Sequence, residues 1–185
     1  MKMRVTAMLG VVLAAGLAAA AAGCGSTRGG NSAIAEAVLA PKSGSKLAGR
    51  AVFRSLGGNW IHLRVEVSGI APGLHAVHIH ETGDCSAPDA KSAGGHWNPT
   101  GRKHGMWGRP DGEFHLGDIG NIDVGADGKG SIDVTTDLWT VGGGAPTDVM
   151  GRSIVVHAKA DDFTTQPTGD AGDRLGCGPI GEVSR

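Results

Sequence analysis

The chain has 185 residues, with 17 lysines and arginines against 18 aspartates and glutamates. This length fits one ordinary domain, and a balanced charge without long charged blocks excludes a nucleic-acid binder that neutralises phosphates. The 33 glycines, four tryptophans, three phenylalanines and no tyrosine predict many turns. They also predict a core of aliphatic side chains, as in a β-sandwich or β-barrel.

Residues 1–23 have the layout of an export signal. Lys2 and Arg4 precede an uncharged stretch rich in Ala, Leu and Val, which ends in small residues before Cys24. This ending resembles a bacterial lipobox. The resemblance implies a lipid on Cys24, attachment to a membrane through that lipid, and a location in the periplasm or cell envelope. Ordinary cleavage a few residues earlier and a retained membrane helix are the alternatives.

Residues 24–46 are rich in Gly, Ser and Ala and contain Pro41. This composition predicts a flexible tether that holds the folded domain, residues 47–185, off the membrane. Residues 34–40 could at most add one or two helical turns to the tether.

The cysteine count agrees with export. If Cys24 carries lipid, Cys85 and Cys177 remain, and two cysteines of one domain usually pair in an oxidising compartment. We therefore expect a disulfide between Cys85 and Cys177. Two buried free thiols are the alternative.

Alternating apolar and polar residues identify the strands. Residues 60–67 place Ile61, Leu63, Val65 and Val67 on one face. Further strands are expected at residues 48–55, 75–80, 119–124, 130–134 and 153–158, with turns at 57–59 and 127–130. Residues 81–116 and 161–175 resist assignment as strands, and long ordered loops in a small domain are usually functional. The prediction is an all-β fold, an antiparallel Greek-key β-sandwich or flattened barrel with two long functional loops.

Two histidines separated by one residue, His78 and His80, lie on one of these strands. Their side chains leave the same face with Cα atoms roughly 6–7 Å apart, so both rings can reach one metal ion. His157, on a later strand, could complete this site.

A second set of metal-ligand residues lies in and after the first long loop: His96, His104, His115 and Asp118. Three imidazoles and a carboxylate form a closed tetrahedral zinc set. Because imidazole suits both zinc and copper, ligand type alone does not choose the metal of either site. The absence of thiolate and methionine ligands argues against a blue-copper centre.

Several ordered segments between about residue 47 and residue 180 resemble copper/zinc superoxide dismutases. They are GLHAVHIH (73–80), GDC (83–85), GGHWNP (94–99), KHG (103–105), HLGDIGN (115–121), GRSIVVHAKADD (151–162) and TGDAGDRLGCG (168–178). The resemblance implies one copper and one zinc per subunit. It assigns copper to His78, His80, His157 and His96, and zinc to His96, His104, His115 and Asp118, with His96 bridging the two ions as an imidazolate.

The same resemblance gives roles to residues outside the two ligand sets. Asp161 matches a carboxylate that links His78 to His104 and so fixes the orientation of both rings. Arg174 matches the arginine at the mouth of the copper channel. The implied reaction is the dismutation of superoxide to dioxygen and hydrogen peroxide, in which copper changes oxidation state, His96 donates a proton and Arg174 guides the anion.

The second long loop departs from the animal and fungal pattern. It is shorter, and it holds three aspartates but no lysine between residues 162 and 173. The stretch from Cys85 to His96 is longer and resembles bacterial members. If the net field still attracts substrate, the rate falls as salt increases. Monomer and homodimer both stay open.

Two other functions use the same residues. A redox-silent module could store copper or zinc outside the cytosol, and a structural domain could keep the fold without copper. Arg174 and Asp161 favour the enzyme, because storage requires no anion guide.

Overall fold

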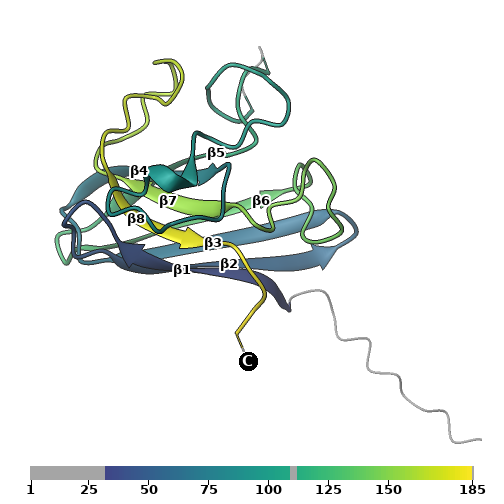
Figure 1. The fold of residues 1–185 in the computed structure, drawn as a ribbon, viewed down its shortest axis with the longest axis horizontal. Coiled ribbons are helices and arrows are strands. Elements are labelled where there is room, and N and C mark those ends of the chain that lie inside the picture. Colours follow the sequence, from purple (N-terminus) through teal and green to yellow (C-terminus); the bar gives the residue numbers. More distant parts are fainter. Residues whose placement is uncertain (1–31, 109–111, 185) are drawn as a thin grey trace, which may run out of the picture.

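The strands of the protein close into one antiparallel barrel, shown in Figure 1. The computed structural model describes residues 32–108 and 112–184. The export signal at residues 1–23 and the expected lipid site at Cys24 lie outside these described residues. The strands are β1 (Ala33–Pro41), β2 (Ala48–Gly57), β3 (Trp60–Ser68), β4 (Gly73–His80), β5 (Asp118–Val124), β6 (Lys129–Thr136), β7 (Ser153–His157) and β8 (Arg174–Pro179).

The barrel order is β1-β2-β3-β6-β5-β4-β7-β8. Strands β4, β5 and β6 follow one another along the chain, and β3 lies beside β6, which is a Greek-key arrangement. The predicted fold class is therefore confirmed. This topology places β4 between β5 and β7, so the strands that carry the expected metal ligands are neighbours. Among the described residues, no helix is long and apolar enough to cross a membrane.

Alternation produces the core as expected. In β3, Ile61, Leu63, Val65 and Val67 are buried inside the barrel, and they pack with Phe53 of β2. The turn between β2 and β3 uses Gly57 and Gly58, whose positive φ angles of 97° and 57° favour glycine. All the strands expected from alternation are present within a few residues.

The tether prediction is wrong from Ala33 onward, as is the helical alternative. Residues 33–41 form β1, which pairs with both β2 and β8. Ala35, Ala37 and Leu39 are buried in the core. Small alanines fit this closely packed edge of the core, although their composition is also typical of a linker.

Strand β8 was not predicted. Residues 161–175 were expected to be a loop, and no structure was assigned to the residues after them. The glycines of β8 allow neighbouring groups to approach closely. A Cβ on Gly176 would lie 2.5 Å from Leu47 Cδ2, and one on Gly178 would lie 2.5 Å from the Val38 carbonyl oxygen. Close packing therefore explains why this strand is rich in glycine and weak in alternation.

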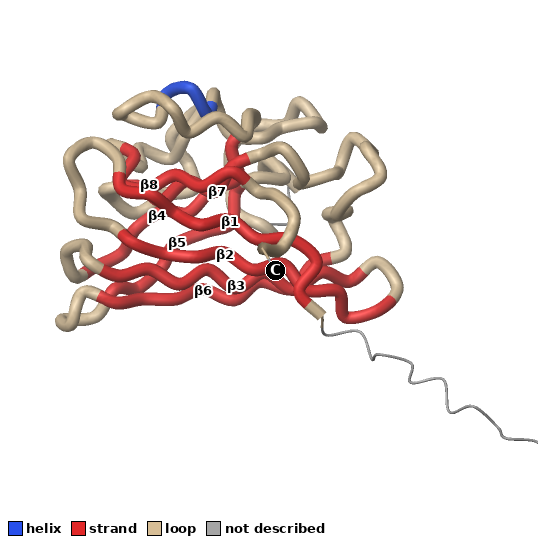
Figure 2. Tube along the Cα trace, turned by 60° about the horizontal axis from the view of Figure 1, so that its bottom comes forward, coloured by secondary structure: helices blue, strands red, loops and turns tan. Residues whose placement is uncertain are grey.

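The first long loop, whose short helical turn is blue in Figure 2, lies outside the barrel wall. In its described residues, 81–108 and 112–117, this loop contains one short 3-10 turn, η1 (Lys91–Ala93), among otherwise irregular structure. A disulfide joins Cys85 in this loop to Cys177 in β8, with Cα atoms 5.7 Å apart. The predicted pairing is confirmed, and it attaches the loop to the barrel wall.

Candidate metal centre

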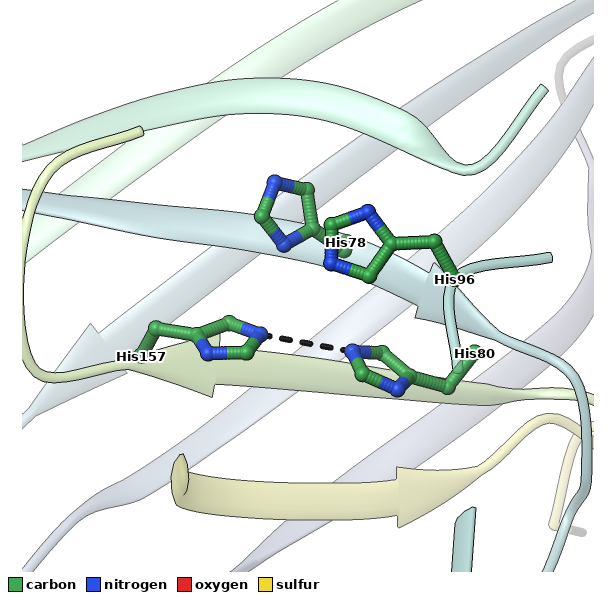
Figure 3. A group of neighbouring side chains, drawn as sticks. All are labelled: His78, His80, His96 and His157. Atoms are coloured by element: carbon green, nitrogen blue, oxygen red, sulfur yellow. Dashed lines mark hydrogen bonds between the residues drawn. The ribbon is translucent and has the colours of Figure 1, made fainter. Parts of the chain in front are cut away.

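Four histidines from three segments converge on one buried point (Figure 3). Strand β4 supplies His78 and His80, β7 supplies His157, and the loop after β4 supplies His96. All four rings are buried, and one nitrogen from each lies within 4.8 Å of the others. The structure therefore brings together the residues that the sequence proposed as copper ligands.

Hydrogen bonds determine which nitrogen of each ring faces this point. His80 Nδ1 donates to the Gly94 carbonyl at 3.0 Å, and His157 Nδ1 donates to the Gly172 carbonyl at 3.3 Å. The Nε2 atoms of these two rings consequently face each other at 3.3 Å. His78 donates through Nε2, so its buried Nδ1 has no hydrogen-bond partner among the described residues. Three lone pairs thus point to one place, which is what a metal ion requires.

Burial keeps these rings in the neutral, ligand form. Desolvation, and then the neighbouring His96, hold the pKa of His78 well below its ordinary value. Burial and the nearby His157 lower the pKa of His80 in the same way. The pKa of His157 falls to about 3, again chiefly because of burial.

The second group contains His96, His104, His115 and Asp118, whose ligand atoms also lie within 4.8 Å of one another. The Nδ1 atoms of these rings lie 2.9, 3.0 and 3.2 Å from Asp118 carboxylate oxygens, in that residue order. Although burial raises the pKa of Asp118, the three adjacent imidazoles hold it well below its usual range. Three imidazoles around an ionised carboxylate match the closed donor set of a zinc site.

His96 belongs to both groups. Its Nδ1 lies on the side of Asp118, and its Nε2 is buried without a hydrogen-bond partner among the described residues. The His96 ring centroid lies 3.9 Å from that of His78 and 5.6 Å from that of His115. One ring therefore presents a nitrogen to each donor set.

Asp161 joins the two groups a second time. One oxygen accepts from His78 Nε2 and the other from His104 Nε2, each at 2.8 Å. Burial opposes a charge on His104, but the adjacent carboxylates of Asp118 and Asp161 raise its pKa to about 9. A single buried carboxylate thus orients one ring of each set.

Two amide side chains support this arrangement, and sequence reasoning gave them no role. Gln166 accepts from the His104 backbone N–H and donates to the His104 carbonyl, both at 2.9 Å. Asn121 pairs in the same way with the backbone of Asp161, at 2.7 and 3.0 Å. Asn121 lies in a segment that resembles copper/zinc superoxide dismutases, but nothing in the sequence marks Gln166.

Arg174 lies beside the first histidine group. Its guanidinium donates to the carbonyls of Ala90 and Gly94, each at 2.7 Å. The Gly94 carbonyl also accepts from His80, so the arginine and this ring share one acceptor. A small cavity adjoins the arginine and is also lined by Asp89 and Lys91. The structure thus places a fixed positive charge beside the histidine cluster.

Comparison with known proteins identifies the family. A sequence model described as copper/zinc superoxide dismutase matches residues 47–180. The chain belongs to the copper/zinc superoxide dismutase family. The match ends within five residues of the end of the chain but begins after β1, although β1 is part of the barrel.

Two curated relatives carry the family name. An extracellular superoxide dismutase [Cu-Zn] of Caenorhabditis elegans is 42% identical over 132 residues, which cover 68% of this chain and 58% of the relative. A superoxide dismutase [Cu-Zn] of Caulobacter vibrioides is 45% identical over 123 residues, covering 64% of this chain and 70% of the relative. The matched part of the chain therefore spans just over half of the nematode protein and more of the bacterial one.

Solved structures show the same fold. The clock protein EA4 superposes with a TM-score of 0.71 and 32% identity over 82% of this chain and 95% of its own. A double mutant of a superoxide-dismutase-like protein from Bacillus subtilis gives a TM-score of 0.68 and 32% identity, covering 77% of this chain and 94% of that one.

Proposed function

We propose that this protein converts superoxide to dioxygen and hydrogen peroxide outside the cytosol. The observation that carries the proposal is the His96 ring, which belongs to a four-histidine group and to a three-histidine, one-carboxylate group at once. Copper would be held by His78, His80, His96 and His157, and zinc by His96, His104, His115 and Asp118. The family membership supports the choice of these two metals.

The donor atoms fit these ions. Buried nitrogens of His78, His96, His104 and His115 have no hydrogen-bond partner among the described residues, and buried polar atoms are normally satisfied. When bound, copper supplies one-electron redox chemistry and zinc supplies a charge of constant value. The residues of the chain must then bind the anion, exclude water and deliver protons.

Proton delivery falls to His96. An imidazole loses its second proton only when cations hold both nitrogens, and the His96 ring faces one donor set with each nitrogen. Its Nε2 lies on the side of His78, His80 and His157, where the substrate reacts. When no cation holds Nε2, this atom carries one of the two protons that convert the reduced dioxygen species to hydrogen peroxide, and water supplies the second.

Arg174 binds and orients the substrate. Two of its five N–H donors are bonded to backbone carbonyls, which hold the guanidinium in place. The remaining donors and the positive charge suit a small anion. Since the Gly94 carbonyl holds both Arg174 and His80, the anion site is fixed relative to the metal ligands.

Export and lipid attachment complete the proposal. The extracellular nematode relative supports export. The signal peptide at residues 1–23 and the lipid on Cys24 rest on the sequence pattern, as does attachment to a membrane. The protein acts as a monomer or as a homodimer, and sedimentation of the exported protein decides between the two.

A paired measurement tests the function. We expect the exported protein to contain one copper and one zinc per chain and to consume superoxide, and Arg174→Ala to lose most of the rate while it retains copper. Arg64→Ala is the control, because Arg64 lies exposed on β3 in ion pairs with Glu66 and Asp133. Both metals without any superoxide consumption would instead indicate a metal store.

A further inference from the structure

Exposed apolar side chains gather at one end of the barrel. Leu56, near the end of β2, and Trp60, at the start of β3, are 45% and 50% exposed, and Leu138, after β6, is 37% exposed. The pairing of Ile61 with Thr136 brings the β2–β3 turn beside the end of β6. We call Leu56, Trp60 and Leu138 the apolar end. Such side chains cost free energy in water, and grouped ones mark an interaction site.

The described chain begins at this same end. Ala33 pairs with Arg54, which places the start of β1 beside the end of β2. Ile34 also lines a pocket together with Gly58 of the β2–β3 turn and Val141 of the loop after β6.

The connection to the proposed lipid site is short. Because β1 begins at Ala33, only residues 25–32 separate it from Cys24. Even a fully extended chain of this length spans at most about 30 Å. A lipid on Cys24 would therefore hold this end of the barrel close to the bilayer, unlike a tether that continued to residue 46.

We propose that the apolar end docks on the lipid surface next to the anchor. This inference rests on the lipid proposed for Cys24. Trp60 takes the headgroup boundary, where tryptophan is favoured, and Leu56 and Leu138 enter the acyl region. The neighbouring charges are of both signs, with Arg54 on β2 and Asp137 next to Leu138. Docking is therefore apolar and does not depend on anionic lipid or on salt.

Docking at this end leaves the substrate site in water. Pro41, at the other end of β1, pairs with Gly176, two residues from Arg174. The eight residue steps from Ala33 to Pro41 correspond to roughly 27 Å along the strand. Arg174 consequently lies at the far end of β1 and β8 from the bilayer.

Tryptophan fluorescence can test this contact. Trp97 and Trp139 are 2% and 1% exposed and Trp107 is partly buried, so Trp60 is the tryptophan that lipid can reach. The lipid-modified full-length mature protein is reconstituted in phosphatidylcholine vesicles whose acyl chains carry bromine. We expect these vesicles to quench a component of the emission that Trp60→Phe removes.

Two variants separate docking from anchoring. We expect Leu56→Ser combined with Leu138→Ser to lower the quenching at least threefold without changing superoxide consumption. Leu74→Ser is the matched control and leaves quenching unchanged, because Leu74 is 51% exposed on β4 and pairs with Asp123 near the opposite end.

The outcomes distinguish docking from lipid attachment. If Cys24 carries lipid by mass spectrometry and the protein floats with vesicles but Trp60 is not quenched, docking is refuted and the anchor stands. An unmodified Cys24 refutes both, while the dismutase assay is unaffected. A concentration-dependent dimer that shields Trp60 without vesicles would refute docking and assign the apolar end to a second copy of the chain.

Discussion

A methyl group at Gly169 would displace the carboxylate that joins the two metal-ligand groups. Gly169 has a φ of +66°, and a Cβ there would lie 1.9 Å from Asp161 Oδ1 and 2.7 Å from His104 Nε2. The Asp161 oxygen must retreat by about 1.5 Å to reach the 3.4 Å of an ordinary van der Waals contact. Gly169→Ala therefore perturbs the site without replacing a proposed metal ligand.

The magnitude follows from the bonds that this movement breaks. Asp161 Oδ1 accepts from His104 Nε2 at 2.8 Å and from the Phe163 backbone N–H at 2.7 Å. Hydrogen bonds to a charged group contribute about 1.5–3 kcal/mol each, so their loss costs about 3–6 kcal/mol. A non-glycine residue in the left-handed region adds roughly 1–2 kcal/mol. Loss of the partner that orients His104 should weaken zinc binding about 10–100-fold.

Gly101→Ala is the matched control. Gly101 has a similar φ of +64°, but a Cβ there meets nothing within 4 Å, so only the backbone cost applies. Urea unfolding of the metal-free protein measures stability, and competition with a chromophoric chelator measures zinc affinity. If Gly169→Ala matches Gly101→Ala in both measurements, the view that Asp161 must remain in its observed position is refuted.

Three further predictions concern stability and rate. Replacing Cys85 and Cys177 by serine opens a loop of 92 residues, which costs roughly 4–5 kcal/mol by chain entropy; a loss under about 1 kcal/mol in urea unfolding would contradict this. The metal-free protein should lose stability as pH falls from 6.5 toward about 3, because the unfolded state protonates His157 before the folded state does. His157→Gln should flatten that slope, and an unchanged slope would assign it to other groups. The superoxide rate should fall with ionic strength, since salt screens the field of Arg174; a rate that rises with salt would show that the net field repels substrate.

Much of the fold was predictable because its determinants are local. Apolar and polar residues alternate strictly in β3, and glycine turns adjoin both of its ends. The alternation and the turns were therefore sufficient to predict this strand. Strand β1 was not, because Ala35 and Ala37 are small enough for a linker and become core only through β2 and β8. Strand β8 was not predictable for a similar reason, because a glycine such as Gly176 has no side chain and cannot contribute to an alternating pattern.

The metal centre, too, was predictable from the sequence only in part. The residue types and their order in the chain were sufficient to propose the three-histidine set, the zinc set and the disulfide, and the family resemblance added His96 to the first set. Only the folded structure decides that His78 turns Nε2 to Asp161 and leaves Nδ1 for a metal. It also decides that Gln166 binds the His104 backbone. The position of the apolar end beside the start of β1 is likewise a result of folding. Chemical identity and periodicity belong to single residues and short segments. Ring orientation and proximity instead depend on contacts such as that between His78 and Asp161, which are 83 residues apart.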